Sequence, residues 1–146
     1  MRTLLAIVVL LLTTHNVHAA GPVCSEVNAL ASSAASYRDQ GLTQDQLRYP
    51  LPPRDYFAGD PSNPKAAELQ LMHEIVDELY LEPALPSDLY VFFKTEQCRL
   101  RVSSPSAALS LSSALGALKA CDSLKDADRA ACAAKAAAIE LPSNGS

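Results

Sequence analysis

The sequence predicts an all-α fold, a compact bundle of five to six helices with two disulfides, after a cleaved signal peptide. Three observations lead to this prediction. Apolar residues recur every three or four positions along most of the chain, as they do on one face of a helix. Capping residues and prolines bound these stretches. Four cysteines follow an export signal, and an even number of cysteines in an oxidising compartment is typical of disulfide bonds.

Residues 1–19 are predicted to be a secretory signal peptide. Arg2 supplies the positive end, an apolar run extends from Leu4 to Leu12, and small residues precede Ala20. The run is too short to cross a membrane, and no later stretch approaches the roughly 20 apolar residues of a spanning helix. We therefore expect cleavage before Ala20 and a soluble mature protein that is periplasmic or secreted.

The formal net charge of −4 narrows the classes of partner. Nucleic acids and anionic membranes attract basic surfaces. The sequence therefore predicts no nucleic-acid partner, and it predicts no membrane span. Its length suits a single helical domain over 20–141, followed by a loose tail over 142–146.

The first helix is predicted over 23–40, and its end is well marked. Gly41 suits the left-handed position just past a helix. Thr43 then starts a short second helix that stops at Tyr49, with Gln46 completing a capping box. The apolar face of the first helix is expected to hold Val23, Val27, Leu30, Ala34 and Tyr37.

A proline-rich loop follows over 50–64. It contains five prolines, which exclude a regular helix or a central strand. Long loops in compact domains are often functional, and tyrosine and arginine are favoured binding anchors. The candidate binding residues are therefore Tyr49, Arg54, Tyr56 and Phe57. In the alternative interpretation, Tyr56 and Phe57 tuck beneath the loop and seal the core.

The third helix is predicted over 64–82, with Asn63 as its cap and Pro64 at its first position. Its polar face is expected to carry Glu68, Glu74, Asp77 and Glu78. Its buried stripe is expected to hold Leu69, Met72, Ile75, Val76, Leu79 and Tyr80.

The segment 88–102 permits two interpretations. Its run Tyr90 to Phe93 favours a strand. The capping residue Ser87 before it, and a disulfide from Cys98 to the first helix, favour a helix. We predict a helix.

Residues 105–141 are predicted to form an alanine-rich helical hairpin. Ser104 and Pro105 open it, the chain turns near 125–126, and Pro142 ends the second arm. Its inner face is expected to hold Ala108, Leu111, Leu115 and Leu118.

The four cysteines allow three disulfide connectivities. Cys121 and Cys132 lie symmetrically about the hairpin turn, and neighbouring alanines let the two helices approach to the roughly 5–6 Å between Cα atoms that a bridge needs. This pairing leaves Cys24 for Cys98. We expect the longer bridge to stabilise the fold more, because it closes a longer loop.

One motif raises the alternative of a metal-dependent hydrolase. His73, Glu74 and Asp77 differ by one residue from the zinc-protease pattern H-E-x-x-H, and positions four apart share a helix face. A catalytic zinc ion typically needs three protein ligands, however, and no second histidine follows residue 19. A boundary histidine in a packed helix is the commoner case, so we predict no metal site.

Other catalytic patterns are missing from the sequence. It has no G-x-S-x-G elbow, no C-x-x-C motif and no glycine-rich phosphate loop. Asp55 and Asp60 form a carboxylate pair in the loop, but solvated loop charges are the usual case. We therefore expect a protein that is not an enzyme and takes no cofactor.

The arrangement of Cys24, Tyr37-Arg38-Asp39-x-Gly41, Val76-x-x-Leu79-Tyr80-x-x-Pro83 and Cys98 resembles a loose group of small exported bacterial proteins of unknown function. These proteins are helical and contain a disulfide-bonded module. The resemblance covers residues 24–98 only and implies no activity.

Together these observations predict an exported, non-enzymatic module that contacts a protein partner through the 50–64 loop, in an inhibitory or immunity-like role. Besides the metal-dependent hydrolase, an apolar-ligand carrier is an alternative. A carrier needs a cavity among the helices, which a core of small residues is poorly suited to line.

Overall fold

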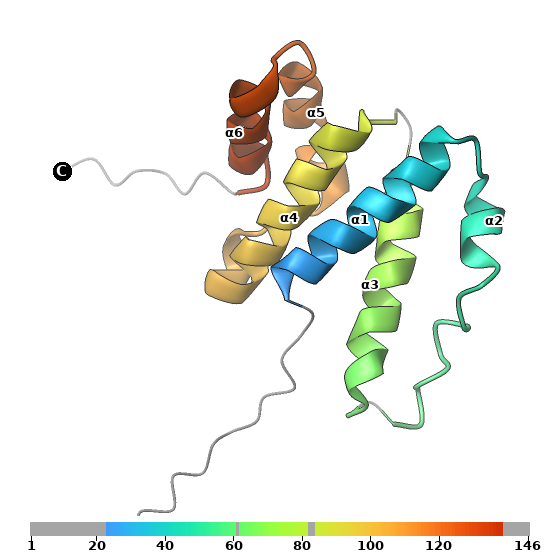
Figure 1. The fold of residues 1–146 in the computed structure, drawn as a ribbon. Coiled ribbons are helices and arrows are strands. Elements are labelled where there is room, and N and C mark those ends of the chain that lie inside the picture. Colours follow the sequence, from blue (N-terminus) through green and yellow to red (C-terminus); the bar gives the residue numbers. More distant parts are fainter. Residues whose placement is uncertain (1–22, 61, 82–83, 139–146) are drawn as a thin grey trace, which may run out of the picture.

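The computed structural model describes residues 23–60, 62–81 and 84–138. Within these ranges the chain forms helices and no β-strand, so the predicted all-α bundle is confirmed (Figure 1). The elements are α1 (Cys24–Asp39), α2 (Gln44–Arg48), α3 (Pro64–Leu79), α4 (Ser87–Ser103), a 3₁₀ turn (Pro105–Ala107), α5 (Leu111–Cys121) and α6 (Asp126–Ala136). The predicted signal peptide, the cleavage point, the loose tail and Pro142 lie outside the described residues.

The helix α1 lies across α3 and α4 and contacts both of them (Figure 1). On one side of the α3 and α4 pair, α2 and the proline-rich loop run beside α3. On the other side, the α5–α6 hairpin packs against α4. No helix within the described residues is long and apolar enough to cross a membrane.

The end of α1 and the start of α2 form as the sequence predicts. Gly41 has φ of +91°, which a residue without a side chain adopts at low cost. Leu42 then folds back, and its amide donates to the carbonyl of Tyr37. In α2, Thr43 and Gln46 form the predicted capping box.

The prediction that Ser87 caps the fourth helix is wrong. The helix α4 begins at Ser87 itself, with Pro86 in the capping position. The Ser87 hydroxyl donates instead to Asp39 and accepts a hydrogen bond from Arg38 at 2.7 Å. The end of α1 thus takes up this side chain, which sequence spacing alone assigned to α4.

The hairpin also starts later than predicted. Pro105 opens only a 3₁₀ turn, and α5 begins at Leu111, where Ser110 accepts a hydrogen bond from the Ser113 amide. Leu118 is buried on the inner face as expected. Leu115 is only half buried, and Ala114 takes its place in the core.

The central contact of the bundle is the crossing of α1 over α4. On α1 the fully buried positions are Val27, Ala31 and Ala35, whose small side chains let the two helices approach closely. The apolar face predicted for this helix is only partly correct, because Val23 and Tyr37 are exposed. Since α1 is covered by both α3 and α4, its buried stripe is centred between the two partners.

Both predicted disulfides are present. Cys24 on α1 pairs with Cys98 on α4, with 5.6 Å between the Cα atoms. Cys121 pairs with Cys132 across the hairpin at 5.7 Å. The segment 88–102 is helical, as predicted, and belongs to α4. In this helix Cys98 lies next to Cys24 at the start of α1. Two disulfides fit an extracytoplasmic protein.

Candidate functional site

The proline-rich loop is attached to α3 by a stripe of three polar residues. Gln70, His73 and Asp77 are spaced three and four positions apart, so they share one helix face. Gln70 donates to the carbonyl of Arg54 at 2.9 Å, and His73 Nε2 lies 2.9 Å from the carbonyl of Pro52. Two separate points of the loop backbone are therefore fixed to the helix.

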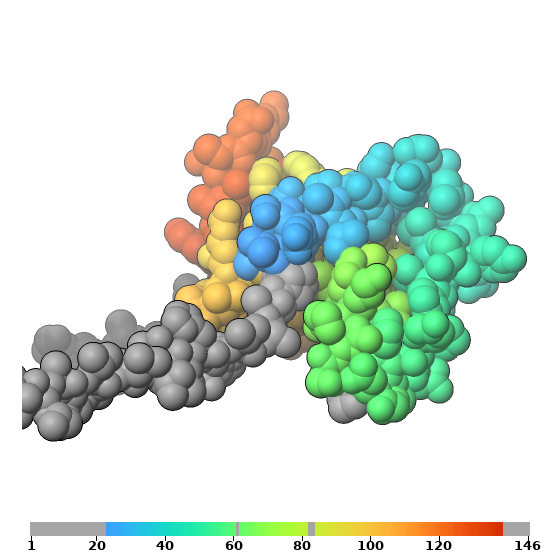
Figure 2. Space-filling model, turned by 60° about the horizontal axis from the view of Figure 1, so that its bottom comes forward, coloured from blue at the N-terminus to red at the C-terminus, as the bar shows by residue number. Residues whose placement is uncertain are grey.

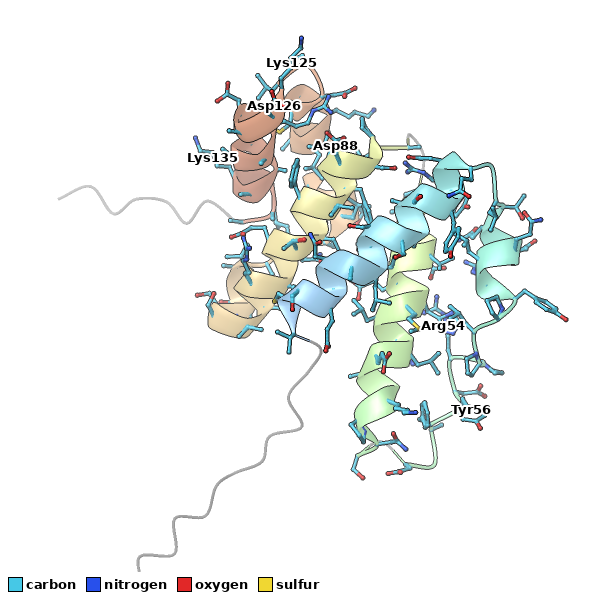
Figure 3. All side chains as sticks on the ribbon, in the orientation of Figure 1. Arg54, Tyr56, Asp88, Lys125, Asp126 and Lys135 are labelled. Atoms are coloured by element: carbon cyan, nitrogen blue, oxygen red, sulfur yellow. A yellow bond between two sulfur atoms is a disulfide. The ribbon has the colours of Figure 1, made fainter. Side chains whose placement is uncertain are left out.

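Asp77 completes this attachment. Its carboxylate accepts hydrogen bonds from Arg48 at the end of α2 and from Arg54 in the loop. Burial opposes ionisation of Asp77, but these two guanidinium groups outweigh it and hold the pKa of the carboxyl below its ordinary value. The charged form of Asp77 thus ties both ends of the segment 48–54 to α3. Figure 3 shows Arg54 and Tyr56 on the loop alongside this helix.

The four predicted binding residues differ in exposure. Tyr49 is 92% exposed and Tyr56 is 65% exposed. Phe57 is half buried and meets the Tyr56 ring edge-on, with 5.0 Å between centroids. Arg54 is held by Asp77. The alternative that Tyr56 seals the core is wrong, because its side chain is largely exposed. Phe57 is half buried, and Pro50 and Leu51 at the start of the loop face the apolar residues Met72, Ile75 and Val76 of α3.

In the space-filling view the segment from α2 to the loop (teal) lies against α3 (green) and forms the outer edge of the molecule (Figure 2). We call Tyr49, Arg54, Tyr56 and Phe57 the aromatic surface. Within the loop, Asp60 accepts hydrogen bonds from Ser62 and Asn63, so it serves the turn before α3.

On another side of α3, a buried ion-pair network contradicts part of the predicted polar face. Lys94 on α4 is only 1% exposed, and its ammonium lies 2.6 Å from Glu74 and 2.7 Å from Glu78. Tyr90 also donates to Glu78 at 3.0 Å. Glu78, expected to face solvent, is therefore turned inward by a cation on α4 that no spacing along α3 reveals.

The two carboxylates of the network have opposite pKa shifts. Burial raises the pKa of Glu78, and Lys94 offsets only part of this rise. Burial also opposes ionisation of Glu74, but the hydrogen bond from Arg101 and the charge of Lys94 outweigh it and lower the pKa to about 2. Glu74 is more exposed than Glu78 and has two cationic partners.

These contacts engage all three residues of the zinc-protease-like motif. His73 Nε2 bonds the Pro52 carbonyl, Glu74 is bound by cations of α4, and Asp77 is bound by arginines of the 48–54 segment. Within the described residues, no three or more His, Cys, Asp or Glu side chains gather in a metal-binding arrangement. The motif holds the fold together at these positions.

A cavity of about 360 Å³ lies between α1, α3 and α4. The sequence argued against such a cavity because the core residues are small. Its walls come instead from long side chains of α3 and α4, among them Leu71, Gln97 and Arg101. The sequence did not single out Gln97 or Lys94 as site residues, and the only available signal was their spacing of three on one helix.

The residues that carry the sequence resemblance meet in space. Arg38 donates to the carbonyl of Leu79, and the Tyr80 hydroxyl donates to the carbonyl of Leu42. They join the end of α1 to the end of α3, so their role in this chain is to close the bundle.

A scan against protein-family models, a search of curated proteins and a search of solved structures each found no match to this chain.

Proposed function

We propose that this protein is an exported, non-catalytic module that binds a protein partner through the aromatic surface. The observation that carries the proposal is that the loop backbone is held against α3 while its tyrosine side chains are exposed. The backbone around Tyr49 and Tyr56 is attached to α3 by Gln70, His73 and Asp77, yet both rings project into solvent.

Such an arrangement favours binding energetically. Tyrosine rings bring a large contact area with few rotatable bonds, and they are enriched among residues that dominate protein interfaces. A segment already held in one conformation loses less entropy on association than a mobile one. The prolines of the loop reduce that loss further, because they restrict the unbound backbone.

The same geometry supports a periplasmic or secreted, inhibitory or immunity-like role. The two disulfides keep the bundle rigid in an oxidising compartment. A rigid protruding segment can cover a site on a partner without changing its own fold. The net charge of −4 favours a partner whose contact surface is neutral or basic.

The test compares three forms of the oxidised protein: wild type, the double variant Tyr49→Ser/Tyr56→Ser, and Phe92→Ser as the control. Phe92 is an exposed aromatic on α4, away from the loop. The proteins are immobilised and exposed to an extract of the compartment to which they are exported. A retained partner is identified by mass spectrometry, purified and titrated against each form by calorimetry.

We expect stoichiometric binding to wild type and to Phe92→Ser, and an affinity at least 10-fold weaker for the double variant. Circular dichroism should remain helical in all three forms. A partner that binds the double variant as tightly as wild type would overturn the proposal, as would the absence of any partner that discriminates between the forms.

A further inference from the structure

We propose that the cavity between α1, α3 and α4 is a binding site for a small, uncharged aromatic alcohol. Its lining contains no residue of the aromatic surface, and the proposal does not depend on the proposed protein partner. Its volume of about 360 Å³ falls within the range of roughly 300–1,000 Å³ that is typical of small-molecule pockets.

The wall of the cavity contains a buried acceptor without a hydrogen-bond partner among the described residues. Gln97 is 0% exposed and lines the cavity, and its Oε1 has no hydrogen-bond partner within the described residues. Its Nε2 donates to the carbonyl of Leu109 at 2.7 Å. Since a carbonyl only accepts, this contact fixes which amide atom faces Leu109. The oxygen therefore points away from Leu109, and a buried acceptor without a donor is unfavourable.

Lys94 provides a donor near this acceptor. Lys94 and Gln97 are three positions apart on α4, so their side chains lie on the same helix face. Lys94 has three N–H groups, and two of them bond Glu74 and Glu78. One N–H is left without an acceptor among the described residues. A ligand hydroxyl can donate to Gln97 and accept from Lys94, so it satisfies both groups at once.

The charges around the cavity exclude ionised ligands. Glu74 and Arg101 line it together with Lys94, and Glu78, outside the lining, is paired with the Lys94 ammonium. These four groups already balance each other in two cation–anion pairs. An added carboxylate cannot donate to Gln97, and an added ammonium finds both carboxylates already paired with cations. A neutral hydroxyl group avoids both penalties.

Apart from Gln70, the remaining wall is apolar. Val27, Ala67, Leu71, Val102 and the Cys98 end of the disulfide complete the lining. They provide apolar contacts for the body of the ligand. A flat bicyclic phenol combines such a body with one hydroxyl group.

The probe is 2-naphthol, and its matched control is 2-methoxynaphthalene, which has the same rings but no donor. Both are titrated into the purified, oxidised protein by NMR chemical-shift perturbation. We expect 2-naphthol to bind with a dissociation constant of about 10–100 µM, as ligand-efficiency limits allow for a molecule of this size. The methoxy control should bind about 10-fold more weakly.

Two variants and one control test the location. Gln97→Met keeps the volume but removes the acceptor, so the preference for 2-naphthol should disappear. Ala67→Phe fills the cavity from the exposed face of α3, and it should weaken both probes at least 10-fold. Ala120→Phe, an exposed position on α5 outside the cavity, should change neither affinity.

No saturable binding to folded wild type below 1 mM would overturn the proposal. Binding that Ala67→Phe leaves unchanged would also overturn it, and this arm does not depend on the fold tolerating a change at buried Gln97. Equal affinity of wild type for the two probes would remove the hydroxyl requirement and with it the proposed ligand class.

Discussion

The carboxylate of Asp77 on α3 accepts a hydrogen bond from the guanidinium of Arg54 in the proline-rich loop, 23 positions earlier in the chain. The same carboxylate binds Arg48. One side chain thus restrains both ends of the segment 48–54, which contains Tyr49 and ends two positions before Tyr56. The rigidity of the aromatic surface depends on this carboxylate and on its neighbours Gln70 and His73.

Replacing Asp77 with Ala should release the loop while leaving the bundle folded. Because the ion pairs are partly exposed, we expect the free energy of unfolding to fall by only about 1 kcal/mol. Trypsin should cut after Arg48 and Arg54 several times faster, because the loop opens locally. The control is Glu68→Ala, since Glu68 is an exposed residue of α3 and has no ion pair in the described structure. Equal digestion of both variants would contradict the proposed attachment.

Removing Lys94 should destabilise the bundle strongly. Lys94→Met leaves Glu78 buried without its cation, and we expect a loss of about 2–4 kcal/mol in urea unfolding. The double variant Lys94→Met/Glu78→Gln should recover part of this loss, since no isolated charge remains. Lys65→Met, at an exposed position, serves as the control. If the loss of stability in the double variant equals the sum of the losses in Lys94→Met and Glu78→Gln alone, Lys94 and Glu78 are not coupled.

The stability of the protein in acid should depend on Glu74. Its folded-state pKa of about 2 lies below the ordinary 4.5, so its ionised form favours the native state. This contribution is complete above the ordinary pKa and is lost as the pH falls from about 4.5 to about 2. Glu78, whose folded-state pKa is raised, has the opposite dependence: its contribution is lost as the pH rises through that pKa.

The substitution Glu74→Gln isolates the contribution of ionised Glu74 to stability. We expect the variant to be about 1–2 kcal/mol less stable than wild type at pH 6, after allowance for solvent screening. The difference should shrink steadily as the pH approaches 2. Urea unfolding monitored by circular dichroism at a series of pH values measures it. A difference that does not change with pH would show that Glu74 is not held ionised by Lys94 and Arg101.

The two disulfides should differ in their effect on stability. In the chain-entropy model, closing the 74-residue separation of Cys24 and Cys98 contributes about 4.5 kcal/mol, against about 3 kcal/mol for the 11-residue separation of Cys121 and Cys132. We expect Cys24→Ala/Cys98→Ala to lower the Tm more than Cys121→Ala/Cys132→Ala. Calorimetry of the two double variants decides this, and the reverse order would contradict it.

Two glycines provide a matched pair. Gly41 has a positive φ and Gly116 lies within the helix α5, and a Cβ at either position meets no atom within 4 Å beyond its neighbours along the chain. Gly41→Ala should destabilise by about 1–2 kcal/mol through backbone strain. Gly116→Ala should stabilise by about 0.5–1 kcal/mol, because alanine is the better helix former. Shifts of the same sign would contradict the assigned conformations.

The elements with local causes could be predicted from the sequence. The end of α1 at Gly41, the capping box of Thr43 and the cap Asn63 of α3 all depend on neighbours within a few positions. The pairing of Cys121 with Cys132 followed from the symmetry of a short hairpin. These features need no knowledge of how the helices pack.

The exposure of Tyr49 and Tyr56 could not be predicted in the same way. The sequence left a choice between a buried and an exposed loop. The choice is made by Gln70, His73 and Asp77, which present a polar face of α3 to the loop. These contacts join residues about 20 positions apart, so the spacing of residues within the loop does not reveal them.

The sequence by itself determined the helical class, the disulfide pairs and most helix ends, because these follow from periodicity and short-range hydrogen bonds. Tertiary structure alone decided which polar groups became buried. Lys94 reaches Glu78 only because α4 packs beside α3, and Ser87 bonds Asp39 only because α1 crosses nearby. Such contacts join residues that are distant in the chain, and their free energy depends on the burial that packing creates.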